Sequence, residues 1–360
     1  MIMKKIKLFA LALCSAFALS VPQGGEAAAA AVKTYPGYNT TSRYITSLTY
    51  LPGYGTELAA ETQRNLAANP ALPVNEVVVL DFGKPVVNTQ KVKKARVTTY
   101  GTLLFNNTTV ASVKDIEASV ERFVDAFESS MTGTGYTLTV AVGTSNYGSS
   151  VTKAHGQEWG RMINTINAYI KAKGYSSVKV IGASDIETAW NAAGVTRAWV
   201  DGYRSTTDSQ LCDYGDAGGM PQASKGAAAY IPGSGSNGWT LEDMWYVSDG
   251  GTDASTGERY SFSLPEIYTP SGTQAAQWFN LALYSRLAKG QQLSIYGVMT
   301  DYAADPSMNS PESGWNQLAG YIGSSSVTSA DLAEDTYFMQ WSTDISWNLN
   351  RMRMTNLFIH

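Results

Sequence analysis

Two carboxylates, Asp185 and Glu187, stand two residues apart in the segment IGASDIETAW, just after an apolar, β-branched run. Alternate residues of a strand point to the same face, about 6.5–7 Å apart along the backbone. Two carboxylates this close repel each other, which raises the pKa of one of them. Glycoside hydrolysis requires one protonated and one ionised carboxyl group, so Glu187 is interpreted as the proton donor and Asp185 as the charge-stabilising group. The competing interpretation is that one of the pair only caps the following helix.

Other acids and aromatic residues also follow expected strand ends. Asp81 closes the run EVVVLD and is the third predicted catalytic carboxylate; the alternative is that it pairs with a nearby Arg or Lys. Only 16% of the chain is charged, so acids that recur at strand ends are informative. Seven further residues are predicted to bind substrate, through hydrogen bonds or by stacking on sugar rings: Asp201, Tyr203, Glu266, Tyr268, Asp301, Trp190 and Tyr147.

A barrel would bring these residues together. Apolar runs alternate with helical periodicities and give eight candidate strands: 76–83, 98–105, 136–142, 177–181, 198–202, 210–214, 264–268 and 293–299. Strands joined by helical crossovers are parallel, and eight of them predict an α/β fold of the (β/α)8 TIM-like barrel class. Its active site lies at the carboxyl ends of the strands. An open doubly wound sheet is the alternative.

The chain is expected to contain four segments. Residues 1–30 combine an early Lys cluster, an apolar run from Leu8 to Val21 and small residues near Ala29, which predicts a signal peptide. Residues 31–74 are expected to be an irregular segment packed on the barrel, 75–325 the barrel with long loops after its later strands, and 326–360 a C-terminal extension completing the domain. The predicted location is extracellular, with cell-wall association open, and without stable membrane insertion after cleavage.

Composition excludes several kinds of chemistry. The 26 Lys and Arg against 30 Asp and Glu leave a net charge of −4, without the basic excess that nucleic-acid binding needs. Two His and two Cys are too few for a zinc site, and no G-x-S-x-G elbow supports a serine hydrolase. The run DGGTDASTGE at 249–258 lacks the spacing of an EF-hand loop. No metal ion and no cofactor are therefore expected.

At Asp81 and the D-I-E of residues 185–187, the chain resembles glycoside-hydrolase barrels such as family-25 lysozymes and, more loosely, family-18 chitinases. In the lysozyme family an Asp on the first strand and a D-x-E near mid-barrel line the sugar cleft, which implies the same place for Asp81, Asp185 and Glu187, with Glu187 as acid. The chitinase signature D-x-x-D-x-D-x-E is half kept, since Val180 and Ala183 occupy its first two Asp positions. The strings GASDIE, AWVDGY, LPEIY and WSTDISW look like those of a group of secreted bacterial proteins, which implies a barrel over residues 75–348 but no particular activity.

These patterns together predict a secreted glycoside hydrolase-like protein. Its substrate would be a cell-wall or extracellular polysaccharide, peptidoglycan included, cleaved by carboxylate acid/base catalysis. The alternative is a non-catalytic secreted protein, glycan-binding or toxin-like, on the same barrel. The surroundings of Asp185 and Glu187 distinguish the two: an open arrangement beside Asp81 favours catalysis, and burial against Arg or Lys favours binding.

Overall fold

The computed structural model describes residues 33–68, 70, 73–92, 95–253, 257–334 and 337–347. The predicted signal peptide, residues 1–30, lies outside the described residues. Within the described ranges, no helix is both long enough and apolar enough to cross a membrane.

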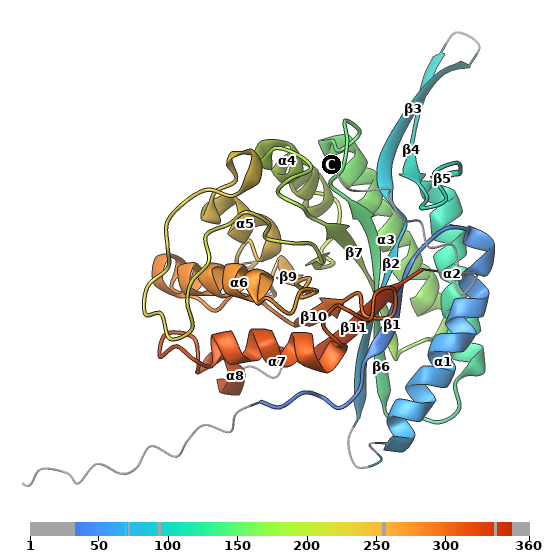
Figure 1. Ribbon diagram of the computed structural model, residues 1–360. Coiled ribbons are helices and arrows are strands. Elements are labelled where there is room, and N and C mark those ends of the chain that lie inside the picture. Colours follow the sequence, from blue (N-terminus) through green and yellow to red (C-terminus); the bar gives the residue numbers. More distant parts are fainter. Residues whose placement is uncertain are drawn as a thin grey trace, which may run out of the picture. The chain divides into compact units, whose positions relative to one another are not determined.

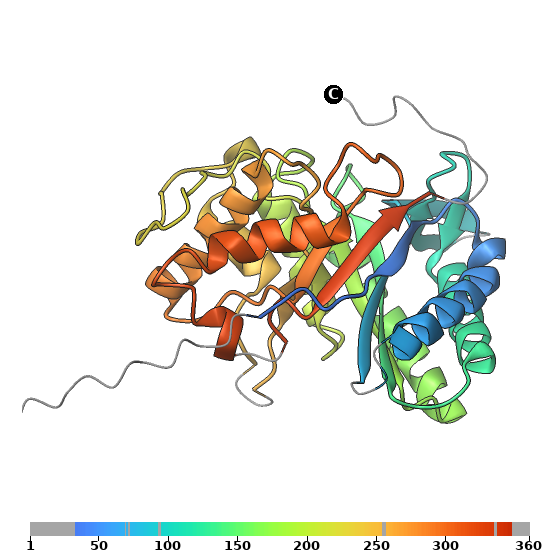
Figure 2. The same ribbon diagram turned by 60° about the horizontal axis from the view of Figure 1, so that its bottom comes forward.

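Eight parallel strands, taken in chain order, form the central sheet (Figure 1, Figure 2). The last strand pairs with the first, and parallel bridges from Ser263 to Ile295 and from Glu266 to Met299 close the remaining gap. The predicted TIM-like (β/α)8 barrel is therefore confirmed. The barrel strands are β1 (Thr40–Tyr44), β2 (Val74–Asp81), β6 (Tyr136–Ser145), β7 (Val178–Asp185), β8 (Leu211–Asp213), β9 (Ser261–Ser263), β10 (Gly297–Thr300) and β11 (Trp341–Ser346).

Helices lie outside the barrel, between successive strands (Figure 1). Local sequence sets several of their ends. Ser112 and Asp115 form a capping box at the start of α2, Thr152 caps α3, and the left-handed Gly174 ends α3. The helices are α1 (Leu51–Ala68), α2 (Val113–Ser130), α3 (Lys153–Lys173), α4 (Ala193–Arg204), α5 (Leu241–Ser248), α6 (Thr273–Tyr284), α7 (Pro311–Ile322) and α8 (Asp331–Glu334).

The strands bury side chains on both faces. One set of alternate residues, including Val77 and Val79 of β2, fills the inside of the barrel. The other set, including Val78 and Leu80, belongs to the larger core formed with the helices. This two-sided burial explains why β2 has a continuous β-branched run. A strand with one face in solvent would instead alternate apolar and polar residues.

The first and last barrel strands lie outside the expected barrel range, and this corrects the predicted segments. Residues 31–74 are not irregular, because they contain β1 and the 18-residue helix α1. Residues 326–360 were expected to complete the domain, and β11 within them is a barrel strand. The boundary at 74/75 is wrong, because it falls inside β2. Candidate strand 198–202 was wrong, because it lies within α4. Candidate 98–105 overlaps a real strand, β4, which is outside the barrel, and candidate 264–268 lies just after the barrel strand β9.

A β-hairpin interrupts the barrel after β2. Its strands, β3 (Lys84–Val92) and β4 (Ala95–Leu103), are antiparallel, and β5 (Val110–Ser112) pairs with the base of β4. Figure 1 shows this hairpin projecting well beyond the barrel strands. Residues 88–91 and 95–99 are exposed, so its outer half packs against nothing in the described chain. We call the hairpin β3–β4 the arm.

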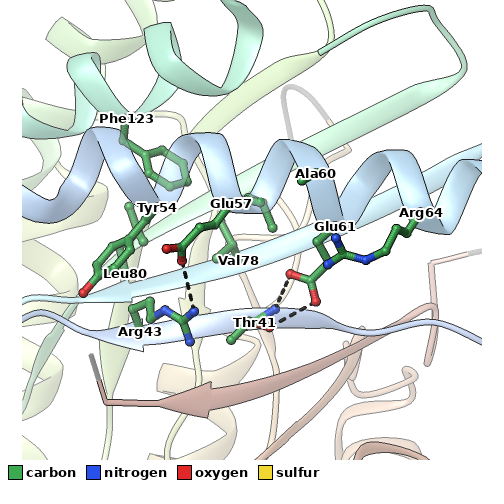
Figure 3. Close-up of a pocket in the computed structure, with 11 residues that line it drawn as sticks. Thr41, Arg43, Tyr54, Glu57, Ala60, Glu61, Arg64, Val78, Leu80 and Phe123 are labelled. Carbon is green, nitrogen blue, oxygen red and sulfur yellow. Dashed lines mark hydrogen bonds and ion pairs between the residues drawn. The ribbon is translucent and has the colours of Figure 1, made fainter. Parts of the chain in front are cut away.

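A polar pocket of about 280 Å³ lies outside the barrel, between β1, β2 and α1 (Figure 3). Arg43 pairs with Glu57 at 3.5 Å and donates a hydrogen bond to Ser346 Oγ at 2.5 Å. Glu61 accepts hydrogen bonds from the amide and the hydroxyl of Thr41 at 3.1 and 3.0 Å. We call this hollow the outer pocket; Arg43, Glu57 and Glu61 each have a polar partner within it.

Candidate active site

Carboxylates gather at the end of the barrel where its strands finish, which we call the mouth. Asp81, Asp185 and Asp213 are the last residues of β2, β7 and β8. Glu266 follows β9 and bridges to Met299 of β10, and Asp301 comes directly after β10. Parallel strands end at one rim, so acids far apart in sequence become neighbours.

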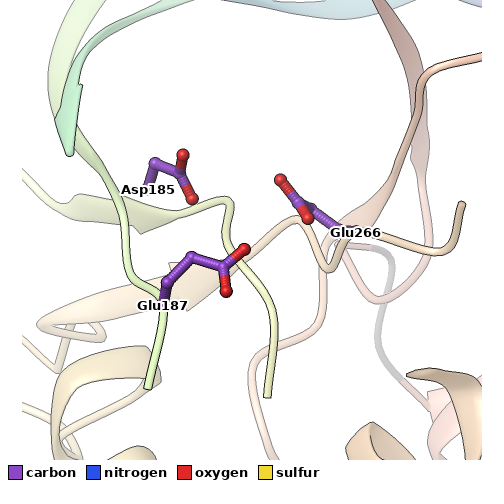
Figure 4. A group of neighbouring side chains, drawn as sticks. All are labelled: Asp185, Glu187 and Glu266. Carbon is purple, nitrogen blue, oxygen red and sulfur yellow. The ribbon is translucent and has the colours of Figure 1, made fainter. Parts of the chain in front are cut away.

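Three of these side chains converge at the centre of the mouth (Figure 4). Asp185, Glu187 and Glu266 each contribute a carboxylate oxygen, and these three oxygens lie within 4.8 Å of one another. Asp185 is 7% exposed and Glu266 is 8% exposed, while Glu187 is half-buried. Oδ1 of Asp185 is buried and has no hydrogen-bond partner in the described chain. We call Asp185, Glu187 and Glu266 the central trio.

Burial and mutual repulsion make the central trio hold protons. Burial raises the pKa of Glu187 to about 8, and the nearby charges of Asp216 and Asp213 add to the rise. Burial, followed by the charge of Glu187, raises the pKa of Asp185 well above its usual range. Burial and then the charge of Asp185 do the same for Glu266. At neutral pH the trio therefore contains at least one carboxylic acid beside other carboxyl groups.

The surrounding acids are also shifted and receive no compensating cation. Burial is the main cause that raises the pKa of Asp81, Asp213 and Asp301 to about 7, and that of Asp216 to about 6. In the part of the chain that the structure describes, none of these four acids and none of the central trio forms an ion pair with Lys or Arg. Of the two arrangements distinguished above, burial against Arg or Lys is therefore not observed in the described chain, and the open arrangement is not observed either, because Asp81 and Asp185 are buried.

A tyrosine orients one member of the trio. Tyr268 donates a hydrogen bond from its hydroxyl to Oε1 of Glu266 at 3.0 Å. A donor of this kind stabilises the ionised form of the carboxylate. Tyr44, at the end of β1, lies near the same acids. Burial raises the pKa of the Tyr44 hydroxyl, and the charges of Asp301 and Glu266 add to the rise. Tyr268 is thus placed at the mouth, in contact with an acid.

Asp81 lies deeper than the trio, with its side chain completely buried. Its Oδ1 accepts a hydrogen bond from the amide of Gly83 at 2.8 Å. Burial raises the pKa of the Asp81 carboxyl group, and the Gly83 amide and the neighbouring Tyr214 hydroxyl act in the opposite direction. The Tyr214 ring fits only because residue 143 is glycine, since a Cβ there would come to 2.4 Å from the Tyr214 hydroxyl oxygen. Asp81 is therefore held in place and contributes negative charge that raises the pKa of Asp185.

Aromatic side chains form two groups near the mouth. Tyr147 and Trp190 meet edge to face at 5.8 Å, and Trp190 lies in the turn that follows Glu187. In the second group, Tyr44 packs at 4.8 Å from both Phe105 and Trp347. The structure thus brings together two of the four predicted aromatic residues, Tyr147 and Trp190. Sequence reasoning missed Tyr44, Phe105 and Trp347, because it missed the strands β1 and β11 that place two of them.

Two predicted substrate-binding residues are wrong. Tyr203 is completely buried in α4, where its hydroxyl accepts from the amide of Gly182 at 2.9 Å and donates to the carbonyl of Gln210 at 3.1 Å. Asp201 is exposed on α4 and accepts a hydrogen bond from Tyr246. Both were expected at a strand end, but residues 198–202 are helical, so neither reaches the mouth.

Fold and site together define a (β/α)8 barrel with a buried carboxylate cluster at its mouth. No known protein family matches the sequence, and no curated protein is similar to it.

Three solved structures illustrate the matches, and each is distant. A mannanase from Thermotoga petrophila is 10% identical, with 86% of this chain and 87% of that chain covered and a TM-score of 0.37. A broad-specificity endoglucanase from an uncultured bacterium is 11% identical, with 88% and 89% covered and a TM-score of 0.35. A plant β-glucan endohydrolase is 13% identical, with 73% and 89% covered and a TM-score of 0.31.

At these values the likeness decides nothing about activity, and the barrel assignment rests on the chain's own strand pairing. The resemblance to family-25 lysozymes is not confirmed by any of these matches. One detail departs from it: Asp81 lies on the second barrel strand, because β1 precedes it.

Proposed function

We propose that this protein is an exported glycoside hydrolase that cleaves a cell-wall or extracellular polysaccharide. The observation that carries the proposal is the convergence of Asp185, Glu187 and Glu266 at the barrel mouth, where none of the three forms an ion pair with a Lys or Arg of the described chain. An acid with a raised pKa beside an ionisable carboxylate is the pair of groups that glycoside hydrolysis needs.

The roles follow from the geometry. Glu187, with its pKa near 8, donates a proton to the glycosidic oxygen as the bond from that oxygen to the anomeric carbon breaks. Glu266 forms the new bond to the anomeric carbon, because it is the member of the trio that accepts a hydrogen bond from the Tyr268 hydroxyl, which opposes the rise in its pKa caused by burial. Asp185, which has a carboxylate oxygen within 4.8 Å of both, stabilises positive charge on the sugar ring. Glu187 then takes a proton from water, whose oxygen displaces Glu266.

The separation of the acids favours retention of configuration. Retaining enzymes hold their two carboxyl groups about 5–5.5 Å apart, and inverting enzymes about 6.5–9.5 Å apart to leave room for water. The nearest oxygens of Glu187 and Glu266 are within 4.8 Å, which fits the shorter class.

Release of reducing sugar from peptidoglycan, chitin and β-glucan tests the proposal. The wild-type protein is expected to cleave at least one of them, and Glu187→Gln to be slower by about 10²–10⁴-fold, the usual contribution of a general acid. Equal rates for the two proteins on every substrate would remove the catalytic assignment. Proton nuclear magnetic resonance of the first product gives its anomeric configuration.

Export is part of the same proposal, supported by the Lys cluster, apolar run and small residues of positions 1–30. Sequencing the amino terminus of protein recovered from the culture medium tests it. Cleavage near Ala29 is the expected result, and a full-length chain retained inside the cells would contradict it.

A further inference from the structure

The arm carries a charge opposite to that of the rest of the chain. From Lys84 to Leu103 the sequence contains five Lys and Arg and no Asp or Glu. The remaining chain has 21 basic and 30 acidic residues. A segregated positive segment on an acidic protein indicates an anionic partner for that segment.

The arm contains an unfavourable pair of charges. Lys91 of β3 lies directly opposite Arg96 of β4, so both side chains are on the same face of the ribbon. Like charges directly opposite each other destabilise a strand pair. Both side chains are exposed, and neither has a hydrogen bond or an ion pair within the described chain. An anionic group between them would relieve the repulsion.

The arm leads to the mouth. The ammonium group of Lys84, at the base of β3, lies 5.4 Å from the centre of the Tyr147 ring, which meets Trp190 beside the central trio. The amide of Val87 donates to Oγ of Ser150 in the loop after β6, which ties the arm to the same side of the barrel. From Lys84 to Lys91 the strand extends about 23 Å. A long polymer would therefore contact the arm and the aromatic pair at once.

We propose that the arm binds an anionic polysaccharide, through the carboxylate or phosphate groups of a repeating chain, and holds it beside the mouth. The proposal builds on the proposed function, since it names the class of polymer that the enzyme meets. Ring stacking places the chain on Tyr147 and Trp190, and ionic contacts to Lys91 and Arg96 hold its outer part.

Two other anionic partners fit the arm less well. A membrane-binding segment inserts large apolar side chains, and Val97 is the one such side chain described as exposed on residues 88–91 and 95–99. Single-stranded nucleic acid is held by stacking its bases on aromatic rings, and these residues contain no aromatic side chain.

Binding can be measured without turnover by using the Glu187→Gln protein. The probes are sodium polygalacturonate for carboxylates, poly(glycerol phosphate) teichoic acid for phosphates, and a neutral β-glucan. Calorimetry in 20 mM NaCl is expected to show at least one of the charged polymers binding roughly 10-fold more tightly than the neutral one. The double change Lys91→Gln and Arg96→Gln should weaken that binding by about 10-fold, and 200 mM NaCl should weaken it further.

The matched control changes two exposed lysines of α3, Lys153→Gln and Lys171→Gln, and should bind like the parent. Equal affinities for the arm variant and this control would overturn the proposal. So would tighter binding to phosphatidylglycerol vesicles or to single-stranded DNA than to either charged polysaccharide. Binding of a charged polymer together with no hydrolysis of any substrate by the wild type would leave this inference standing and refute the proposed function.

Discussion

The outer pocket and the mouth are both lined by acidic side chains, but the acids differ in whether they have a partner that compensates their charge. In the outer pocket Glu57 has Arg43, and Glu61 has both polar groups of Thr41. At the mouth, no acid of the central trio forms an ion pair within the described chain, and Asp185 Oδ1 has no partner at all. The acids of the outer pocket thus have hydrogen-bond or ion-pair partners, as is usual at a protein surface. The buried acids of the mouth lack such cationic partners among the described residues, and this lowers the stability of the folded protein.

Uncompensated buried carboxylates persist where function depends on them. Protons remain on the trio because ionising all three groups would place like charges within 4.8 Å in a buried site. A hydrolase needs such retained protons, and a glycan-binding protein does not. Substitution of a mouth acid should therefore lower activity and raise stability, whereas substitution of an outer-pocket acid should leave activity unchanged and lower stability.

The largest expected difference is in activity. Glu266→Gln removes the carboxylate that attacks the sugar, and kcat/KM should fall by about 10³-fold or more, as is usual when a group required in the transition state is lost. Glu61→Gln in the outer pocket changes an acid of the same type and should alter kcat/KM by less than about twofold. It should cost about 1 kcal/mol of stability, since the amide cannot accept both Thr41 hydrogen bonds. Reducing-sugar rates and urea titrations of the two variants test this contrast, and it fails if both variants lose activity equally.

The second difference is in the sign of the stability change. Mouth carboxyl groups have a higher pKa in the folded than in the unfolded chain, so the folded protein binds more protons. Their contribution to stability is complete below about pH 4 and is lost as pH rises through the folded values, about 7 for Asp81 and about 8 for Glu187. Asp185→Asn should therefore stabilise the protein by about 1–2 kcal/mol at pH 8, with little effect at pH 4.

Urea unfolding of the wild type and Asp185→Asn at both pH values measures this difference. The outer-pocket change Glu57→Gln is the control. It breaks a partly exposed ion pair with Arg43 and should shift stability at pH 8 by less than about 1 kcal/mol. An Asp185→Asn protein that is no more stable than the wild type at pH 8 would show that the mouth acids are compensated after all.

The two regions also show what the sequence could predict about the fold. The buried run of β2 was recognisable, because barrel strands packed on both faces are continuously apolar. β1, with the sequence TTSRY, was not recognisable. Its inward Ser42 bonds to Thr343 of β11 at 2.6 Å, and its outward Arg43 lines the outer pocket, so neither face is apolar. A polar strand of this kind is defined only by the partners that close the barrel.

The site residues were predicted from the ends of expected strands. A residue reaches the mouth where the structure contains the expected barrel strand, and it does not where the segment is helical. Asp185, Glu187 and Glu266 come together because they follow true barrel strands. Asp201 failed because the apolar run beside it is the inner face of α4, where Trp199 and Val200 are buried. Short apolar runs fit a helix and a strand equally well, and only tertiary packing separates them.

Substitution of Tyr268 should lower activity less than substitution of the acids does. Tyr268→Phe removes the hydrogen bond to Glu266, which disfavours the ionised form of that carboxylate and raises its pKa further. We expect kcat/KM to fall by about 5–10-fold near pH 6, because the acidic limb of its pH profile moves upward. Recovery of most of the rate at higher pH marks a positioning role. A pH-independent loss would indicate that Tyr268 contacts the substrate instead.

The smallest expected effect concerns the aromatic side chains at the mouth. Trp347 packs on Tyr44 at 4.8 Å and is half-buried, which leaves part of its ring for a sugar to stack on. Trp347→Ala should raise KM by about 3–5-fold and leave kcat nearly unchanged, since a stacking contact is worth about 1 kcal/mol and is made equally in the ground and transition states. The matched control is Tyr337→Ala, which removes a 56% exposed aromatic ring near the start of β11, at the other end of the barrel. If both variants raise KM alike, the polysaccharide is not held at the mouth, and the contrast between mouth and outer pocket reflects stability alone.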